Sequence, residues 1–409
     1  MRKFGILSPE ARTFNLRRSA FDNPLLRRWD RQVYQSILSC LIPGRMGTGL
    51  SMETLQSQIV QYLGIGNALL CASGSLALEI ALRACDVHAG DEVVLPSFCC
   101  TSVVPPIVAV GAMPVLADVG AELNLTAETV AHALTQKTRA VIVPHLFGNP
   151  AEIDRIVELV SSRNIRVIDD AAQALGATIE GRPVGSFGDA GVLSFGAEKI
   201  CSGIGGGAAV ARGDQIAAKF SLTAVSEPLT LTALKQLLSI TSGRRVRLWN
   251  DQPNSKTPDR LPIPYRRERI SHPAAALASI LMRTLAQNLS ARQARVRAYR
   301  DLFADCSGIE LIGHRQGSAC LTQVIRLPAS GRHDDPAARL IVVLKNAGYH
   351  VRGSYLPIHL LASFSHCVWD RLPHTDRLWA DLVELPCDPN VSLIDIERMA
   401  ALVKRSIRC

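Results

Sequence analysis

The sequence has few aromatic residues, few lysines and no long uninterrupted hydrophobic segment. Aromatic residues make up 5% of the 409 residues, and eight residues are lysine. The most apolar stretch, 103–117, is shorter than a membrane-spanning helix and contains three prolines, so we predict no membrane span. Few aromatic residues accompany the arginine clusters near 244–247 and 266–269. Nucleic-acid binding is therefore not expected, despite a net charge of +9.

Cysteine pairs with metal-ligand spacing are also missing. The eleven cysteines are scattered, and none forms a CxxC pair or a Cys/His cluster with zinc spacing, so we predict no metal site and no iron–sulfur cluster. The first residues, Met1–Gly5, lack the apolar run of a secretory signal. Reduced thiols and a cytoplasmic location are the simplest interpretation.

The chain is apolar and long enough to bury a large core. Hydrophobic residues make up 47% and charged residues 20%, which excludes a disordered, collagen-like or small disulfide-stapled protein. No internal repeat or low-complexity tract is present.

Short apolar segments alternate with helical patterns between residues 46 and 220. The pattern predicts helices at 52–63, 76–85, 126–134 and 151–163, and strands at 68–71, 92–95, 113–119, 139–146, 165–168, 190–195 and 206–211. Strands joined by helices of this length form a mostly parallel sheet, and ligands bind where such strands end. The sequence therefore predicts an α/β domain.

Three further regions flank this domain. Residues 1–45 form a polar lead-in, and 221–272 form a proline-rich, basic arm. Residues 273–409 begin with a long helical stretch at 273–303 and continue as a smaller α+β domain. That domain has strands expected at 309–312 and 320–327, helices at 336–347 and 393–407, and an extended segment at 351–359.

Ser73-Gly74-Ser75 lies between a predicted strand and a predicted helix. A helix N-terminus offers unpaired N–H groups to an anion, so this segment could hold a phosphate. Taken alone, however, the segment favours an ordinary serine N-cap.

Two more polar segments follow later strands. Asp169-Asp170 could pair with a cationic ligand nitrogen, or could be a solvated turn. Lys199 follows Ser194 and precedes the glycine-rich 203–207, and could form a Schiff base or lie on the surface. A phosphate site, a carboxylate and a lysine in this order are what pyridoxal phosphate requires.

The chain resembles the DegT/StrS-type aminotransferases, which are mostly sugar aminotransferases of fold type I. The resemblance runs from about Gly49 to Ile407. Its matching segments are 73–78, 90–93, 144–148, 168–173, 194–199, 206–207, 355–359 and 385–386. The resemblance implies a seven-stranded, mostly parallel sheet with flanking helices, a homodimer and bound pyridoxal phosphate.

The family pattern also implies roles for single residues. Lys199 would form the Schiff base and act as the general acid and base, and Asp170 would pair with the pyridine nitrogen. The other implied positions are Gln173 near the ring and its phenolic oxygen, Gly74, Ser75 and Ser194 at the phosphate, and His359 near the substrate.

Two positions depart from the family pattern. Cys100 stands where an aromatic residue usually stacks on the cofactor ring. Arg267 stands where an asparagine usually reaches the phosphate of the neighbouring subunit. The arginine could bind that phosphate, or it could bind an anionic group of the substrate.

The sequence thus predicts a pyridoxal-phosphate-dependent aminotransferase that moves an amino group from an amino acid, expected to be glutamate, to a nucleotide-linked keto sugar. The product would enter a surface polysaccharide or a natural product. One alternative is a sugar dehydratase or another lyase. Lys199 argues against it, because the family's dehydratases commonly carry histidine there. Another alternative is a cofactor-binding regulatory protein without turnover, which Cys100 and Arg267 would support.

Overall fold

The computed structural model describes residues 50–196, 198–201, 204–211, 265–328, 335–349 and 351–407. The predicted lead-in 1–45 lies outside these residues. So does the predicted arm 221–272, except for residues 265–272. The domain boundaries therefore stay predictions.

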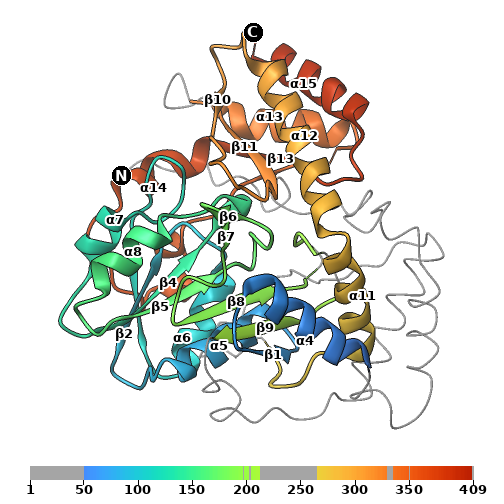
Figure 1. Cartoon of the computed structure of the whole chain (residues 1–409). Helices are drawn as coiled ribbons and strands as arrows, with labels where there is room; N and C mark the ends of the chain where they lie inside the picture. The colour runs from blue at the N-terminus through green and yellow to red at the C-terminus, as the bar shows by residue number, and fades with distance from the viewer. Residues whose placement is uncertain are drawn as a thin grey trace.

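A seven-stranded sheet forms the centre of the described structure (Figure 1). Its strands, in spatial order, are β1 (Asn67–Cys71), β9 (Gly207–Ala211), β8 (Ala190–Ser194), β5 (Arg166–Asp170), β4 (Thr138–Pro144), β2 (Glu92–Pro96) and β3 (Met113–Ala117). Only β9 runs antiparallel to its neighbours in this sheet. The predicted α/β class with a mostly parallel sheet is confirmed.

Helices cover both faces of this sheet. On one face, α5 (Gly74–Ala84) and α6 (Val104–Ala109) share a buried core with Val93, Leu95 and Ile142. On the other face, α4 (Leu50–Leu63) and α11 (His272–Arg283) pack over β1, β8 and β9, while α7 (Ala127–Ala133) and α8 (Ile153–Val160) pack over the other half. Because adjacent residues of a strand face opposite layers, the strands are apolar throughout.

Side-chain caps begin several of these helices. Ser73 precedes α5 in an extended conformation, and its hydroxyl accepts a hydrogen bond from Leu76 N–H. Thr126 and Thr129 cap each other's backbone at the start of α7, and Ser271 caps α11. Such caps satisfy N–H groups that have no acceptor within the helix.

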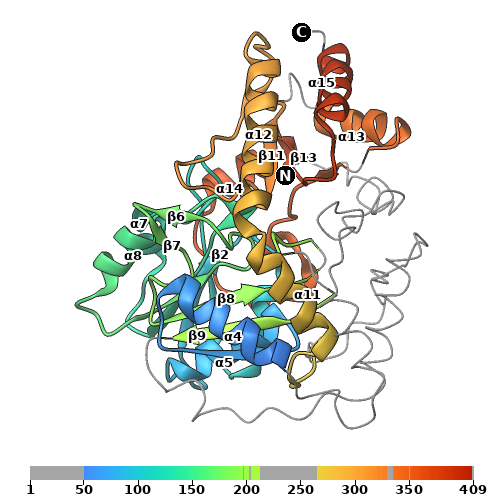
Figure 2. The same cartoon turned by 45° about the vertical axis from the view of Figure 1, so that its right-hand side comes forward.

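The C-terminal part forms a smaller lobe with its own core, above the domain of the large sheet in the view of Figure 2. A four-stranded antiparallel sheet has the order β10 (Glu310–Leu311), β11 (Thr322–Arg326), β13 (Leu382–Pro386) and β12 (Arg352–Gly353). The helices α12 (Leu285–Phe303), α13 (Pro336–Asn346) and α15 (Leu393–Ile407) share its core.

The remaining described elements are short. They are the hairpin β6 (Thr178–Ile179) and β7 (Arg182–Pro183), the helix α14 (Pro373–Leu378), and the 3-10 helices η2 (Thr101–Val103), η3 (Leu146–Gly148), η4 (Ile358–Leu360), η5 (Ala362–Phe364) and η6 (Trp379–Asp381). None of the helices described is long and apolar enough to cross a membrane.

Most described cysteines carry free thiols. Eight of them do so, and Cys306 is disulfide-bonded, so the prediction of reduced thiols is wrong for this residue. A cytoplasmic location stays a prediction from the sequence.

Candidate active site

The predicted site residues of the large domain gather at one edge of the seven-stranded sheet. Parallel strands end at the same edge, and β1, β5 and β8 end there just before Gly74, at Asp170 and at Ser194 respectively. Strand β9 begins at this edge, and Ser73 forms an isolated bridge with Gly206. Ligands of such sheets bind at this edge.

The N-terminus of α5 and the end of β8 are in direct contact. A Cβ atom placed on Gly74 would lie 2.9 Å from the Cβ and 3.0 Å from the Oγ of Ser194. The side chain of Ser194 is 8% exposed and therefore almost buried against the helix start. The first N–H groups of a helix have no acceptor within it, so these groups and the hydroxyl of Ser194 form a cradle for an anion. A larger residue than glycine would fill this cradle.

Ser75 extends the cradle toward the segment after β2. Its hydroxyl donates a hydrogen bond to the carbonyl oxygen of Ser102, at 3.3 Å. The thiol of Cys100 lies 2.9 Å from the Ser102 hydroxyl and is half-buried. Cys100 is thus near the predicted phosphate site, and its predicted place at the cofactor ring stays a prediction.

The two adjacent aspartates at the end of β5 have different partners. Asp169 is fully buried and accepts hydrogen bonds from His145 Nε2, at 2.7 Å, and from Phe187 N–H, at 2.8 Å. His145 Nδ1 accepts from Ala151 N–H, so Nε2 carries the ring proton. Asp169 therefore holds neighbouring segments together.

No charged group among the described residues is in direct contact with the carboxylate of Asp170. Its Oδ1 accepts one hydrogen bond, from Ala172 N–H at 3.0 Å, and it is 6% exposed. Burial raises the pKa of Asp170, while the Ala172 N–H and the charge of nearby Lys199 act in the opposite direction. A buried carboxylate of this kind is suited to a cationic ring nitrogen.

Lys199 lies five residues beyond the end of β8 and is partly exposed. Its N–H donates to the carbonyl of Gly196 in a tight turn. The charge of Lys199 acts on Asp170, so the lysine and the carboxylate lie near each other. The structure thus brings together the three signals found in the sequence.

Gln173 is oriented by the turn η3. Its Oε1 accepts a hydrogen bond from Phe147 N–H at 3.1 Å, which leaves its amide N–H groups as the donors toward the site. Phe147 has a left-handed backbone with φ of 60°, and its ring stacks on Tyr355 at 6.0 Å between centroids. Phe98 contacts both rings. The C-terminal part thereby supplies one wall of the site.

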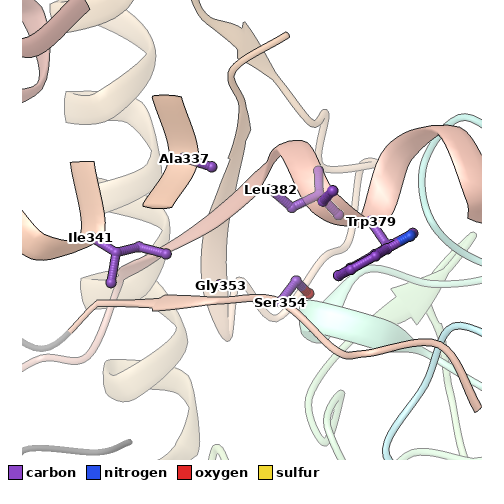
Figure 3. Close-up of a pocket in the computed structure, with 7 residues that line it drawn as sticks. Ala337, Ile341, Gly353, Ser354, Trp379 and Leu382 are labelled. Carbon is purple, nitrogen blue, oxygen red and sulfur yellow. The ribbon is translucent and has the colours of Figure 1, made fainter. Parts of the chain in front are cut away.

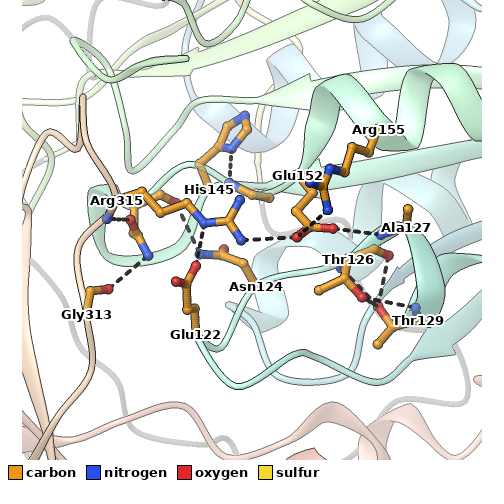
Figure 4. A network of polar contacts seen from close by, with 12 residues as sticks. Glu122, Asn124, Thr126, Ala127, Thr129, His145, Glu152, Arg155, Gly313 and Arg315 are labelled. Carbon is orange, nitrogen blue, oxygen red and sulfur yellow. Dashed lines mark hydrogen bonds and ion pairs between the residues drawn. The ribbon is translucent and has the colours of Figure 1, made fainter. Parts of the chain in front are cut away.

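A polar network holds η3 in this conformation (Figure 4). The guanidinium of Arg315 binds both Glu122 and Glu152. Its backbone N–H donates to Asn149 Oδ1, and Asn149 Nδ2 donates to the carbonyl of Gly313. The segment 313–321 of the C-terminal part is therefore docked onto the turn that orients Gln173.

Arg267 lies near the cradle but binds a carboxylate of its own chain. Two of its nitrogens contact Glu79, at 2.6 and 3.3 Å, and Arg83 and Tyr265 share that carboxylate. Glu79 is fully buried on α5, whereas the side chain of Arg267 is 47% exposed. The neighbouring Glu268 accepts a hydrogen bond from Ala72 N–H, so this segment runs beside the cradle.

His359 is held by two side chains and lies outside the contacts of the cradle. Its Nδ1 is 2.7 Å from Ser97 Oγ, and its Nε2 is 2.9 Å from Asp376 Oδ1. This order of residues matches a serine hydrolase triad, but Ser97 is fully buried and cannot reach a substrate. Its predicted place near the substrate stays a prediction.

Two hollows in the described structure lie away from this site. The cavity in Figure 3 is about 10 Å³, enough for one water molecule, and is lined by Ala337, Ile341, Gly353, Ser354, Trp379, Ala380 and Leu382. A second hollow, of about 290 Å³, lies at the amino ends of β2, β4 and β5. Its lining includes Lys137, Arg139 and Arg163. Within the described residues no group of His, Cys, Asp and Glu side chains is arranged to hold a metal ion.

Sequence reasoning missed several residues that shape the site. Ser102 and Phe147 orient Ser75 and Gln173 through long-range contacts. Arg352 contacts Glu198, the residue before Lys199. Tyr355 lies in one of the segments that match the family pattern, but the sequence alone does not predict its packing against Phe147.

This fold, with a lysine, a buried carboxylate and an anion cradle at one sheet edge, is that of an aminotransferase. The chain belongs to the DegT/DnrJ/EryC1/StrS aminotransferase family, and the sequence model of that family matches residues 29–404. The predicted family and enzyme class are confirmed.

Three known proteins illustrate the relationship. A UDP-N-acetyl-3-dehydro-alpha-D-glucosamine 3-aminotransferase of Acidithiobacillus ferrooxidans is 39% identical over 40% of this chain and 44% of its own length, so this match spans less than half of the relative. GDP-perosamine synthase of Caulobacter vibrioides is 27% identical over 86% of this chain and 89% of its own. The structure of the aminotransferase TlmJ from Streptoalloteichus hindustanus is 25% identical, covers 93% of this chain and 97% of its own, and has a TM-score of 0.74.

Proposed function

We propose that this protein transfers an amino group from an amino acid to a nucleotide-linked keto sugar, with pyridoxal phosphate as its cofactor. The observation that carries this proposal is the placement of Lys199 and Asp170 beside the cradle of Gly74 and Ser194. Family membership supports the cofactor. The two relatives named above act on UDP- and GDP-linked sugars by their names, which supports a nucleotide-linked acceptor.

The residues present fit this cofactor. Ser75, Ser194 and the first N–H groups of α5 would hold its phosphate, and Gly74 leaves room for it. Asp170 would pair with the ring nitrogen, and Gln173 would direct its amide N–H groups at the ring's phenolic oxygen. When bound, pyridoxal phosphate supplies an aldehyde that combines with amines and a ring that withdraws electrons.

The protein's own groups would then perform three tasks. The Nζ of Lys199 would take the proton from the Cα of the donor in the first half of the cycle and would deliver a proton to the carbon of the acceptor in the second. The buried charge of Asp170 would keep the ring nitrogen protonated, which is its stable state beside a carboxylate in a site of low polarity. The wall of Phe98, Phe147 and Tyr355 would limit the access of water.

The visible absorption spectrum tests this proposal. The protein is mixed with pyridoxal phosphate, and L-glutamate is then added. We expect a visible band from the lysine-bound cofactor that disappears with glutamate, and no such band in Lys199→Ala. Lys137→Ala is a matched control, because Lys137 lies at the opposite edge of the sheet. A band that forms in Lys199→Ala, or no band in the wild-type protein, would refute the proposal.

We further propose a homodimer in which Arg267 reaches the phosphate of the neighbouring subunit. Glu79 is already bound by Arg83 and Tyr265, so it retains partners if Arg267 turns away. Mixing the inactive variants Lys199→Ala and Arg267→Ala tests this arrangement. A mixed dimer has one site with both residues intact, so activity should return. If activity does not return although mixed dimers form, Arg267 acts within its own chain.

A further inference from the structure

Arg352 carries a guanidinium that two carboxylates share. It lies on the edge strand β12, directly opposite Glu384 of β13, and its Nε donates to Glu384 Oε2 at 2.9 Å. Its second contact is from Nη1 to Glu198 Oε2, at 3.1 Å. Glu198 immediately precedes Lys199. Arg352 therefore joins the small sheet to the segment that carries the lysine.

The two carboxylates differ in how easily another anion can replace them. The side chain of Glu384 is 3% exposed, and loss of its arginine would leave a buried charge uncompensated. The side chain of Glu198 is 47% exposed, and ion pairs of this kind are weak because water screens them. An incoming anion can thus displace Glu198 while Glu384 keeps the guanidinium in place.

Glu198 occupies the position near Lys199 where the carboxylate of an amino-acid substrate would have to bind. An α-amino acid carries its carboxylate on the carbon that bears the reacting amine. A cation that binds this carboxylate must therefore lie close to Lys199. A guanidinium binds carboxylates through paired N–H donors, and Arg352 is 31% exposed and so accessible.

We propose that Arg352 binds the α-carboxylate of the amino donor and that Glu198 holds this position when no donor is present. The inference rests on the proposed function, because it assumes that an amino acid supplies the amine. A nucleotide diphosphate fits this position poorly, because Glu384 and Glu198 would repel its several negative charges. A single α-carboxylate brings one negative charge to this position, which one guanidinium can bind.

The test measures the reaction of the cofactor-loaded protein with increasing concentrations of the L-amino acid that reacts fastest in a panel of the common ones. The change in the visible spectrum gives an apparent dissociation constant and a maximal rate. We expect Arg352→Gln to raise the dissociation constant about tenfold or more and to change the maximal rate much less. We expect Glu198→Gln to lower the constant about twofold to fivefold, because a competing carboxylate is removed.

Two variants control for damage to the fold. Arg352→Gln/Glu384→Gln removes the buried charge together with its partner and should show the same weakened binding as Arg352→Gln. Arg326→Gln removes an arginine of strand β11, on the far side of β13, that also binds two carboxylates, Glu310 and Asp381, and should leave the constant unchanged.

The outcomes separate this inference from the proposed function. If no amino acid changes the spectrum of the wild-type protein, both fail. If an amino acid reacts and its dissociation constant stays within about twofold in the Arg352 variants, only the role of Arg352 is refuted. A weaker rather than stronger binding in Glu198→Gln would show that Glu198 does not compete with the donor, and would overturn that part.

Discussion

Gly74 and Ser194 meet so closely that a side chain on the glycine would displace the serine. The Cβ of an alanine at position 74 would lie 2.9 Å from the Cβ of Ser194. Gly74→Ala should therefore push the Ser194 hydroxyl away from the start of α5. We expect the dissociation constant of pyridoxal phosphate to rise about tenfold to hundredfold, which corresponds to about 1.4–2.7 kcal/mol. Titration of the cofactor-free protein, followed by absorbance, measures this change.

Gly313→Ala is the control for this substitution. No atom lies within 4 Å of a Cβ at Gly313, and its backbone does not have a positive φ. Its cofactor affinity should equal that of the wild-type protein. An unchanged affinity in Gly74→Ala would mean that the phosphate does not occupy the cradle.

Asp169 and Asp170 are neighbours for which we expect opposite effects of the same substitution. Asp170→Asn removes the charge near Lys199, so the rate of the reaction with the amino donor should fall about hundredfold or more. Asp169→Asn should leave this rate unchanged. It should instead lower the free energy of unfolding by about 1–3 kcal/mol, because one of its two donors would face an amide N–H.

Single-turnover rates and urea unfolding of both variants separate the two roles. Each variant serves as the control of the other, since both residues are buried at the end of the same strand. A large loss of rate in Asp169→Asn, with stability unchanged, would reverse the assignment.

The large sheet could be predicted because its strands are buried on both faces and are therefore continuous apolar runs. The runs at 139–146 and 190–195 correspond to β4 and β8 within a few residues. The helix α6 was missed, because Pro105 and Pro106 suggest a loop. They lie in its first turn, where a helix tolerates proline.

Strand β13 was missed for a different reason. Its charge at Glu384 argues against a buried strand, and the ion pair with Arg352 on β12 makes that burial tolerable. The same holds for the site. The order of Ser75, Asp170 and Lys199 along the chain indicated the cofactor, but no local pattern shows that Tyr355 or Arg352 returns to this edge of the sheet.

The docking of segment 313–321 is expected to be sensitive to acid through His314. Burial lowers the pKa of His314 to about 4, against an ordinary value of 6.5. The unfolded chain therefore takes up this proton first. The resulting loss of stability begins as the pH falls below 6.5 and continues to about pH 4. Urea unfolding should show about 1–2 kcal/mol less stability at pH 5 than at pH 7.5 from this group.

His314→Gln provides the comparison. Its amide can replace the hydrogen bond that links His314 to Ser318 and cannot take up a proton. The variant should lose less stability between pH 7.5 and pH 5 than the wild-type protein. An equal loss in both proteins would assign the acid sensitivity to other groups.

Cys100 should be the described thiol that reacts most readily in the native protein, and the cofactor should protect it. It is half-buried, whereas the other free cysteines of the described segments are buried. Burial raises the pKa of Cys71, Cys85 and Cys201 to about 12, which suppresses their thiolate forms. Iodoacetamide should therefore modify Cys100 ahead of these, as peptide mass spectrometry can measure.

If Cys100 takes the place of a ring-stacking aromatic, pyridoxal phosphate at ten times its dissociation constant should slow this modification about tenfold. Inorganic phosphate, at a concentration that fills the cradle, leaves the space of the cofactor ring empty. It should therefore protect Cys100 far less. Equal rates with and without the cofactor would place Cys100 beside the phosphate site but away from the ring. The presence of Cys100 in place of an aromatic residue would then change the shape of the pocket and leave the affinity for the cofactor ring unchanged.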